Sequence, residues 1–215
     1  MMITACLSVI TLSGIAQSKK YEDAMKKNLA LFDSAKKADD YVKIANGFER
    51  IALAEKKDWL SNYYAGMCYV LVAFEKAGDD IDTWCDKADG FIRNADSLSK
   101  NNSEVFVLKS MSASARIGVN PMLRGQKYGG LSGDYQDAAI KLDAKNPRAY
   151  LQKAQGIYFT PEMFGGGAKK AKPIYETAVE KFKTFKPASA IYPDWGKDMA
   201  QKQLAEINEK LNEKK

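Results

Sequence analysis

Apolar residues recur at intervals of three and four along most of this chain, which is the period of an α-helix with one buried face. After Asp80, for example, the series runs through Trp84, Ala88, Ile92 and Ala95. No segment alternates apolar and polar residues as a half-buried strand would, and no succession of strand, helix and strand is visible. The pattern predicts an all-α protein of about nine helices that pack as successive antiparallel hairpins.

Capping and turn residues set the expected boundaries. Asp58 and the pair Asn146-Pro147 are typical of helix starts. We expect one domain over residues 17–215, with an N-terminal hairpin at 19–56, hairpins at 58–98, 102–144 and 147–187, and a capping helix at 194–212. Residues 117–133, rich in glycine and containing Pro121, predict a long loop before a short helix capped by Asp134, and residues 160–167 predict a second irregular connection.

The first sixteen residues carry no charge, and residues 3–15 are mostly apolar. Small residues precede Gln17, as at a signal-peptidase cleavage site. The segment therefore predicts a signal peptide cleaved after Ala16 and an exported protein, most simply a periplasmic one. Lipidation at Cys6 is not expected, because the ten residues after it stay apolar where a lipoprotein has a polar tether. Without residues 1–16, no membrane span remains.

The absence of histidine narrows the chemistry. The sequence has no His, which removes the commonest general base, the commonest zinc ligand and every Ser-His or Cys-His pair. The cysteines show no metal-binding spacing. Asp79, Asp80, Asp82 and Asp86 lack the glycine and the closing glutamate of a calcium loop, and helix capping explains them. We expect no enzymatic activity, no cofactor and no metal site.

The positive charge does not indicate a nucleic-acid partner. There are 33 Lys and Arg against 27 Asp and Glu, a net charge of +6, but only five of the basic residues are Arg. Arg is the residue that pairs bidentately with phosphate and with guanine. The lysines are interleaved with acids, which is typical of solvated helix faces.

Small and aromatic residues recur at fixed offsets between the expected hairpins. Tyr150, Ala154 and Ile157 in one helix are followed by Ala171 and Tyr175 in the next, with a similar arrangement between residues 65 and 95. Here the chain resembles the tetratricopeptide repeat family, in which small residues let two helices approach closely. Residues 139–147 are similar to the linker between repeats of that family.

The resemblance implies a right-handed superhelical stack whose concave face holds a partner. On that basis the chain is expected to be a non-enzymatic protein-binding or scaffolding module of the cell envelope, with a protein or peptide partner. The residues that would contact this partner lie on the first helices of the hairpins: Asn62, Tyr63, Lys109 and Tyr150.

Two irregular segments offer further candidate sites. Arg124, Lys127 and Tyr128, among the glycines of residues 117–133, could hold an anion with their charges and with backbone amides. The alternative is a crossover that packs Met122 and Leu123 onto the stack. No GK[ST] motif follows these glycines, so a nucleotide-binding P-loop is excluded.

Tyr158 and Phe164 flank the second segment, which ends in three glycines. They could line a pocket for a small molecule, or they could anchor a tight entry into the next helix. The alternative function is accordingly a small-molecule carrier associated with an envelope transport system.

Overall fold

The computed structural model describes residues 8–76, 78 and 80–213 of the chain. These residues form nine α-helices and one short 3-10 helix, with no strand among them, so the all-α prediction is confirmed. The elements in chain order are α1 (Ser8–Ser34), α2 (Ala38–Ala54), α3 (Trp59–Phe74), α4 (Asp80–Leu98), α5 (Ser103–Ile117), α6 (Pro121–Leu142), α7 (Pro147–Phe159), η1 (Glu162–Phe164), α8 (Ala168–Thr184) and α9 (Lys197–Asn212).

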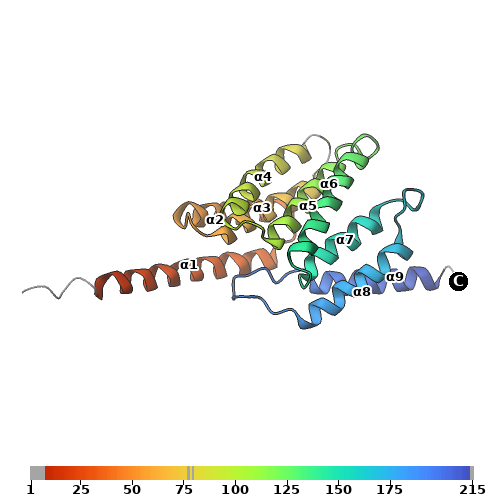
Figure 1. Cartoon of the computed structure of the whole chain (residues 1–215). Helices are drawn as coiled ribbons and strands as arrows, with labels where there is room; N and C mark the ends of the chain where they lie inside the picture. The colour runs from red at the N-terminus through yellow and green to blue at the C-terminus, as the bar shows by residue number, and fades with distance from the viewer. Residues whose placement is uncertain (1–7, 77, 79, 214–215) are drawn as a thin grey trace, which may run out of the picture.

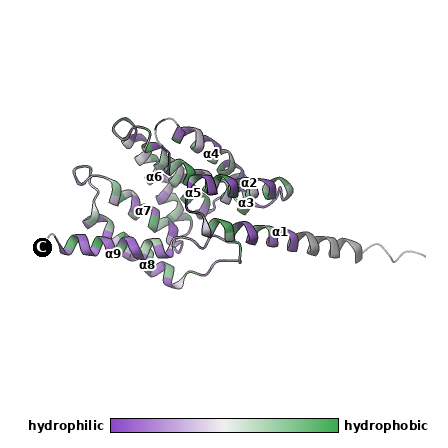
Figure 2. Cartoon of the chain, turned by 180° about the vertical axis from the view of Figure 1, so that it is seen from behind, coloured by the Kyte–Doolittle hydropathy of each residue, from purple (hydrophilic) through white to green (hydrophobic). Residues whose placement is uncertain are grey.

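Consecutive helices pack as antiparallel hairpins, and the most extensive contacts join α5 to α6, α3 to α4, α2 to α3 and α7 to α8 (Figure 1). Close approach depends on small residues. A side chain at Gly66 would lie 3.1 Å from Ile92 and 3.4 Å from the Ala88 carbonyl oxygen, so α3 and α4 can touch only because Gly66 has none. Figure 2 shows that the apolar residues gather where the helices face one another.

Side chains cap the starts of four helices, and two of these caps, Asp58 and Asn146, were predicted. Asp58 accepts hydrogen bonds from the backbone amides of Leu60 and Ser61 at the start of α3. Asn102, Asn120 and Asn146 each accept one such bond at the starts of α5, α6 and α7. These bonds satisfy amides that have no partner within the helix.

The predicted loop at residues 117–133 is wrong, as is the short helix after it. One continuous helix, α6, covers Pro121–Leu142. Asn120 caps it, and Pro121 occupies the first turn, where its missing amide costs nothing. Contacts to α5 offset the low helix propensity of the glycines that suggested a loop. One of these contacts is a hydrogen bond between the hydroxyls of Ser114 and Ser132.

Two main hydrophobic cores lie along the stack, and a third, small cluster contains Ala73, Ile81, Cys85 and Ala115. The larger main core is built mainly from α2, α3, α4 and α5, and the smaller from α7, α8 and α9. Both described cysteines, Cys68 and Cys85, are buried and free.

The segment between α8 and α9, residues 185–196, returns across the stack, and we call it the strap. Its Ile191 is buried in the larger core, and Tyr192 packs edge-on against Trp59. The indole of Trp195 donates a hydrogen bond of 3.0 Å to the Tyr63 hydroxyl, 132 residues earlier in the chain. The end of the chain is thus tied to α3, whereas a solenoid repeat contacts only its neighbours.

Helix α1 extends beyond the rest of the stack at its N-terminal end (Figure 1). It begins at Ser8 and continues through the predicted cleavage point at Ala16. Residues 1–7, which include Cys6, lie outside the described residues. In the part of the chain that is described, no helix is both long and apolar enough to cross a membrane.

Candidate functional site

The face of α6 that packs on α7 continues past the end of α7. Gln136 lies against Gly156 of α7, since a side chain on that glycine would meet the Gln136 amide at 3.2 Å. Helix periodicity places Gly133, Gly129 and Met122 on the same face as Gln136. From Gln136 to Met122 the helix rises by about 21 Å, whereas α7 ends three residues after Gly156.

This part of α6 is uncovered. A side chain at Gly125, Gly129 or Gly133 would meet no atom within 4 Å. Met122 is 93 % exposed, and Leu123 beside it is also exposed. The alternative that packed these two apolar residues onto the stack is therefore wrong.

A second group of exposed apolar residues lies at the C-terminal end of α7 and in η1. Phe159, Met163 and Phe164 are 71 %, 83 % and 73 % exposed. Because consecutive helices are antiparallel, this group lies at the same end of the stack as the first turns of α6 (Figure 1). We call the two groups together the apolar shelf: Met122, Leu123, Gly125, Gly129, Gly133, Phe159, Met163 and Phe164.

Glycines fix the course of the chain beneath Phe164. Gly165 and Gly167 have φ of 89° and 96°, values that other residues rarely adopt. Gly166 is buried so closely that a side chain would lie 2.1 Å from the Thr160 carbonyl oxygen. The expectation of a tight entry into the next helix is confirmed here, but Phe164 itself remains exposed and does not anchor the segment.

Tyr158 does the anchoring that was expected of Phe164. Its ring packs edge-on against Tyr175 of α8, and the Lys210 ammonium of α9 lies 5.5 Å from its centroid. It also meets Phe159 edge-on at 5.1 Å. Tyr158 therefore holds the end of α7 in place while Phe159 faces solvent.

Cationic side chains lie beside the η1 end of the apolar shelf. Lys127 of α6 is not one of them, because helix periodicity turns it by about 160° from Gly129; its ammonium lies 4.9 Å from the centroid of the Tyr128 ring. Near the start of α8, Lys169 and Lys170 are exposed, and the Lys170 ammonium reaches back to within 3.6 Å of the place a Gly165 side chain would take. The surface thus combines apolar area with positive charge.

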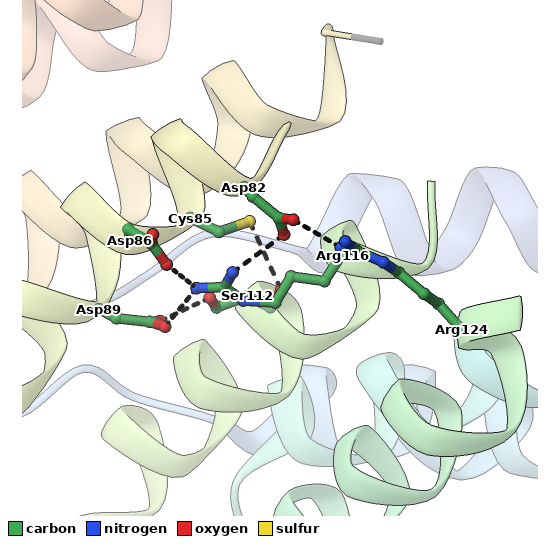
Figure 3. A network of polar contacts seen from close by, with 7 residues as sticks. All are labelled: Asp82, Cys85, Asp86, Asp89, Ser112, Arg116 and Arg124. Atoms are coloured by element: carbon green, nitrogen blue, oxygen red, sulfur yellow. Dashed lines mark hydrogen bonds and ion pairs between the residues drawn. The ribbon is translucent and has the colours of Figure 1, made fainter. Parts of the chain in front are cut away.

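An ion-pair network holds the first turns of α6 against α4 and α5 (Figure 3). Arg124 binds Asp82 of α4 at 2.7 Å, and Asp82 also accepts from Arg116 of α5 at 3.0 Å. Arg116 binds Asp86 and Asp89 as well, each at 2.7 Å. Arg124, predicted as an anion-binding residue, is therefore already paired with a carboxylate.

The same network explains the acids at the start of α4. Partial burial acts to raise the pKa of Asp82, but hydrogen bonds from Arg124 and Arg116 outweigh it and hold that pKa below its ordinary value. Asp80 and Asp82 also occupy the first turn of α4, where a helix favours negative charge. Among the described residues, no cluster of three or more potential metal ligands is present.

The residues predicted for the concave face do not form one surface. Tyr63 is fully buried, and Asn62 is buried with its amide directed to the Asp58 carbonyl oxygen at 3.4 Å. Lys109 pairs with Asp96 at 3.1 Å, and Tyr150 lies beneath the Lys181 ammonium at 4.6 Å. Only Tyr128, Tyr158 and Phe164 lie on or beside the apolar shelf, whereas Lys127 is turned to the other side of α6 and Arg124 toward α4.

Sequence reasoning missed most of the apolar shelf. Of the candidate segment 158–167 only Tyr158 and Phe164 were singled out, Met122 was expected to pack onto the stack, and the glycines of α6 indicated a loop. The signal was available in their spacing: Gly125, Gly129 and Gly133 recur every fourth residue, which puts them on one helix face.

A hollow of about 400 Å³ lies between the end of α8 and the start of α9. Phe185, Trp195 and Met199 line it, together with the carboxylates of Asp194 and Asp198. Lys197 lines it as well, whereas the charged residues beside the apolar shelf are Lys169, Lys170 and Glu162.

The described chain is thus an all-α protein of stacked hairpins, closed by the strap and carrying an open apolar surface flanked by cations. No protein-family model and no curated protein sequence matches it. Among solved structures it is similar to the HusA haemophore from Porphyromonas gingivalis, with a TM-score of 0.81 and 35 % sequence identity over 88 % of this chain and 94 % of that one. The chain belongs to the same family as HusA.

This finding corrects the assignment to the tetratricopeptide repeat family. No model of that family matches, and the structural similarity is to a haemophore. The hairpins and the small residues between them are present, but such features serve any close-packed helical stack. The expected role as a protein-binding scaffold, which rested on that assignment, is wrong as well.

Proposed function

We propose that this protein is a non-enzymatic haem-binding carrier. The observation that carries the proposal is the similarity to a haemophore along nearly the whole of both chains. It favours the alternative of a small-molecule carrier over a protein scaffold.

The apolar shelf has the chemistry that haem requires. Haem presents a flat apolar macrocycle and two carboxylates. The uncovered glycines of α6 allow such a plane to approach the helix backbone, while Phe159, Met163 and Phe164 supply apolar contacts at its edge. Lys169 and Lys170 supply positive charge for the carboxylates.

The lack of histidine sets how haem is held. The commonest protein ligand of haem iron is absent, so affinity has to come largely from the macrocycle and its carboxylates. We expect iron-free protoporphyrin IX to bind as well as haem does.

The test is a titration of the purified chain with haem, followed by the absorbance of the bound porphyrin. Gly129→Leu fills the glycine face and should weaken binding by about tenfold or more. Gly130→Leu is the matched control: its added side chain also meets open space, but one residue along the helix turns it by about 100° away from the shelf.

Failure of the wild-type chain to bind either porphyrin would overturn the proposed function. If both leucine substitutions weaken binding equally, the apolar shelf is rejected as the site, but the proposal that the chain binds haem still stands.

We also propose that the protein is exported and loses residues 1–16. The uncharged apolar start of the sequence supports this, since it has the composition of a signal peptide. Mass spectrometry of the protein from an envelope fraction should give Gln17 as the first residue.

A further inference from the structure

The net charge of the chain is confined to its last third. Residues 145–215 contain 14 basic and 8 acidic residues, whereas residues 1–144 contain 19 of each. The excess of +6 is therefore carried by the part of the chain that forms α7, α8 and α9. Interleaving with acids does not account for this asymmetry.

Two of these basic residues stand beside exposed apolar ones. Lys169 and Lys170 are exposed in the first turn of α8, and neither takes part in an ion pair among the described residues. A lysine pair in the first turn of a helix is also disfavoured by the helix dipole. The structure shows no contact by which these two lysines stabilise the fold. We therefore look for a ligand outside the chain.

The apolar residues next to these lysines are presented on an ordered segment. The Phe164 amide donates to the Pro161 carbonyl oxygen at 2.9 Å, and the Gly167 amide donates to that of Ile157 at 2.9 Å. Because the backbone is already fixed, Phe159, Met163 and Phe164 lose little chain entropy when their side chains are buried by a partner. We call residues 159–170 the α7–α8 tip.

We propose that the α7–α8 tip docks the protein on an anionic lipid surface. Phe159, Met163 and Phe164 enter the boundary between headgroups and acyl chains, and Lys169 and Lys170 bind the lipid phosphates. A bilayer fits these observations better than an acidic protein does, because the apolar side chains are 71–83 % exposed and project outward beside the two lysines. The proposal goes beyond haem carriage and concerns the haem-free chain, because haem is proposed to contact the same side chains.

The experiment is flotation of the haem-free full chain with vesicles of phosphatidylcholine and phosphatidylglycerol, or of phosphatidylcholine alone. We expect binding to the anionic vesicles only, and release at high salt. Lys169→Glu/Lys170→Glu should lower the partition coefficient by about 25-fold or more, since each lysine near an anionic surface contributes about fivefold. Phe159→Ser/Phe164→Ser should lower it by at least about tenfold.

The chain offers a matched control at the turn between α2 and α3. Lys56 and Lys57 are an exposed lysine pair near the exposed Leu53, at a distance from the tip. Lys56→Glu/Lys57→Glu changes the net charge by the same amount and should leave vesicle binding nearly unchanged. An equal loss in this control would mean non-specific adhesion of a basic protein and would overturn the proposal.

Absence of binding to anionic vesicles would also overturn the proposed membrane docking. An acidic protein would then be the expected partner of the α7–α8 tip. The two proposals are separable, because haem is titrated without vesicles and vesicles are tested without haem. Gly129→Leu should impair haem binding and leave flotation unchanged.

Discussion

At the scale of single residues, the glycines of this chain serve two opposite purposes. Gly196 has φ of 102°, and a side chain there would lie 3.0 Å from both Leu151 and Phe182, so the fold requires a glycine. Gly129 is helical and meets nothing, so the fold would be better served by another residue. On the face that carries the apolar shelf, such a glycine leaves room for a ligand to approach the helix backbone.

The same substitution should therefore act with opposite sign at these two glycines. Gly196→Ala should lower the free energy of unfolding by about 1–3 kcal/mol through backbone strain and crowding. Gly129→Ala should raise it by about 0.5–1 kcal/mol, because alanine is the better helix former. Urea unfolding followed by circular dichroism measures both, and a loss of stability in Gly129→Ala would show that this face of α6 is covered.

Asp82 gives a pH-dependent prediction. Its pKa is lowered in the folded protein, so its contribution to stability is present above its unfolded value, near 3.8, and is lost as the pH falls through the folded value. Asp82→Asn should lower the free energy of unfolding by about 1 kcal/mol at pH 6, as expected for partly exposed charge-assisted hydrogen bonds. As the pH falls from 6 to 2, the free energy of unfolding of the variant should approach that of the wild type. A difference that stays constant with pH would contradict the lowered pKa of Asp82.

At the scale of elements, most helices could be predicted from the sequence, because the apolar period and the caps agree. Asp58 and Asn146 cap the helices they were expected to cap. Helix α6 could not be predicted, because four glycines and a proline oppose helix formation locally and only contacts to α4 and α5 compensate for them. Those contacts, such as Arg124 to Asp82, join residues 42 positions apart and leave no local signal.

The candidate site was harder to predict than the elements. Tyr63 and Asn62 are residue types typical of a binding face, yet both are buried in the stack. The strap folds back over α3, where Trp195 binds the Tyr63 hydroxyl. Exposure of Phe159 and Met163 depends on where α7 ends relative to α6. A sequence pattern shows which face of a helix is apolar, but not whether another helix extends far enough to cover it.

Helix α1 is anchored to the body by residues that follow the predicted cleavage point. The Tyr21 hydroxyl donates to Asp58, and the Asn28 amide donates to the Ile44 carbonyl oxygen at 3.0 Å. Removal of residues 1–16 should change the free energy of unfolding by less than about 0.5 kcal/mol. Tyr21→Phe, tested in the shortened chain, should lower it by about 1 kcal/mol; a large effect of the truncation itself would mean that residues 1–16 belong to the fold.

At the scale of the whole molecule, one buried ion pair stands where the two cores and the strap meet. Arg148 of α7 binds Glu104 of α5 through two hydrogen bonds, of 2.6 and 2.8 Å, and both side chains are almost completely buried. Arg148 also stacks on Phe185 and donates to the Trp195 carbonyl oxygen at 3.4 Å. Burial raises the pKa of Glu104 although Arg148 opposes the change, so the pair is held against a desolvation penalty.

This ion pair couples the stability of the larger core to that of the smaller core. Arg148→Met leaves the Glu104 carboxylate buried without its partner and should lower the free energy of unfolding by about 3–5 kcal/mol. Glu104→Leu/Arg148→Met removes both charges and should recover most of that loss, because an apolar pair of similar size has no desolvation penalty. Hydrogen exchange should show α8 and α9 losing protection first in the single variant. If the losses caused by Arg148→Met and by Glu104→Leu alone simply add in the double variant, the pair does not couple the cores, and the strap alone joins the end of the stack to α3.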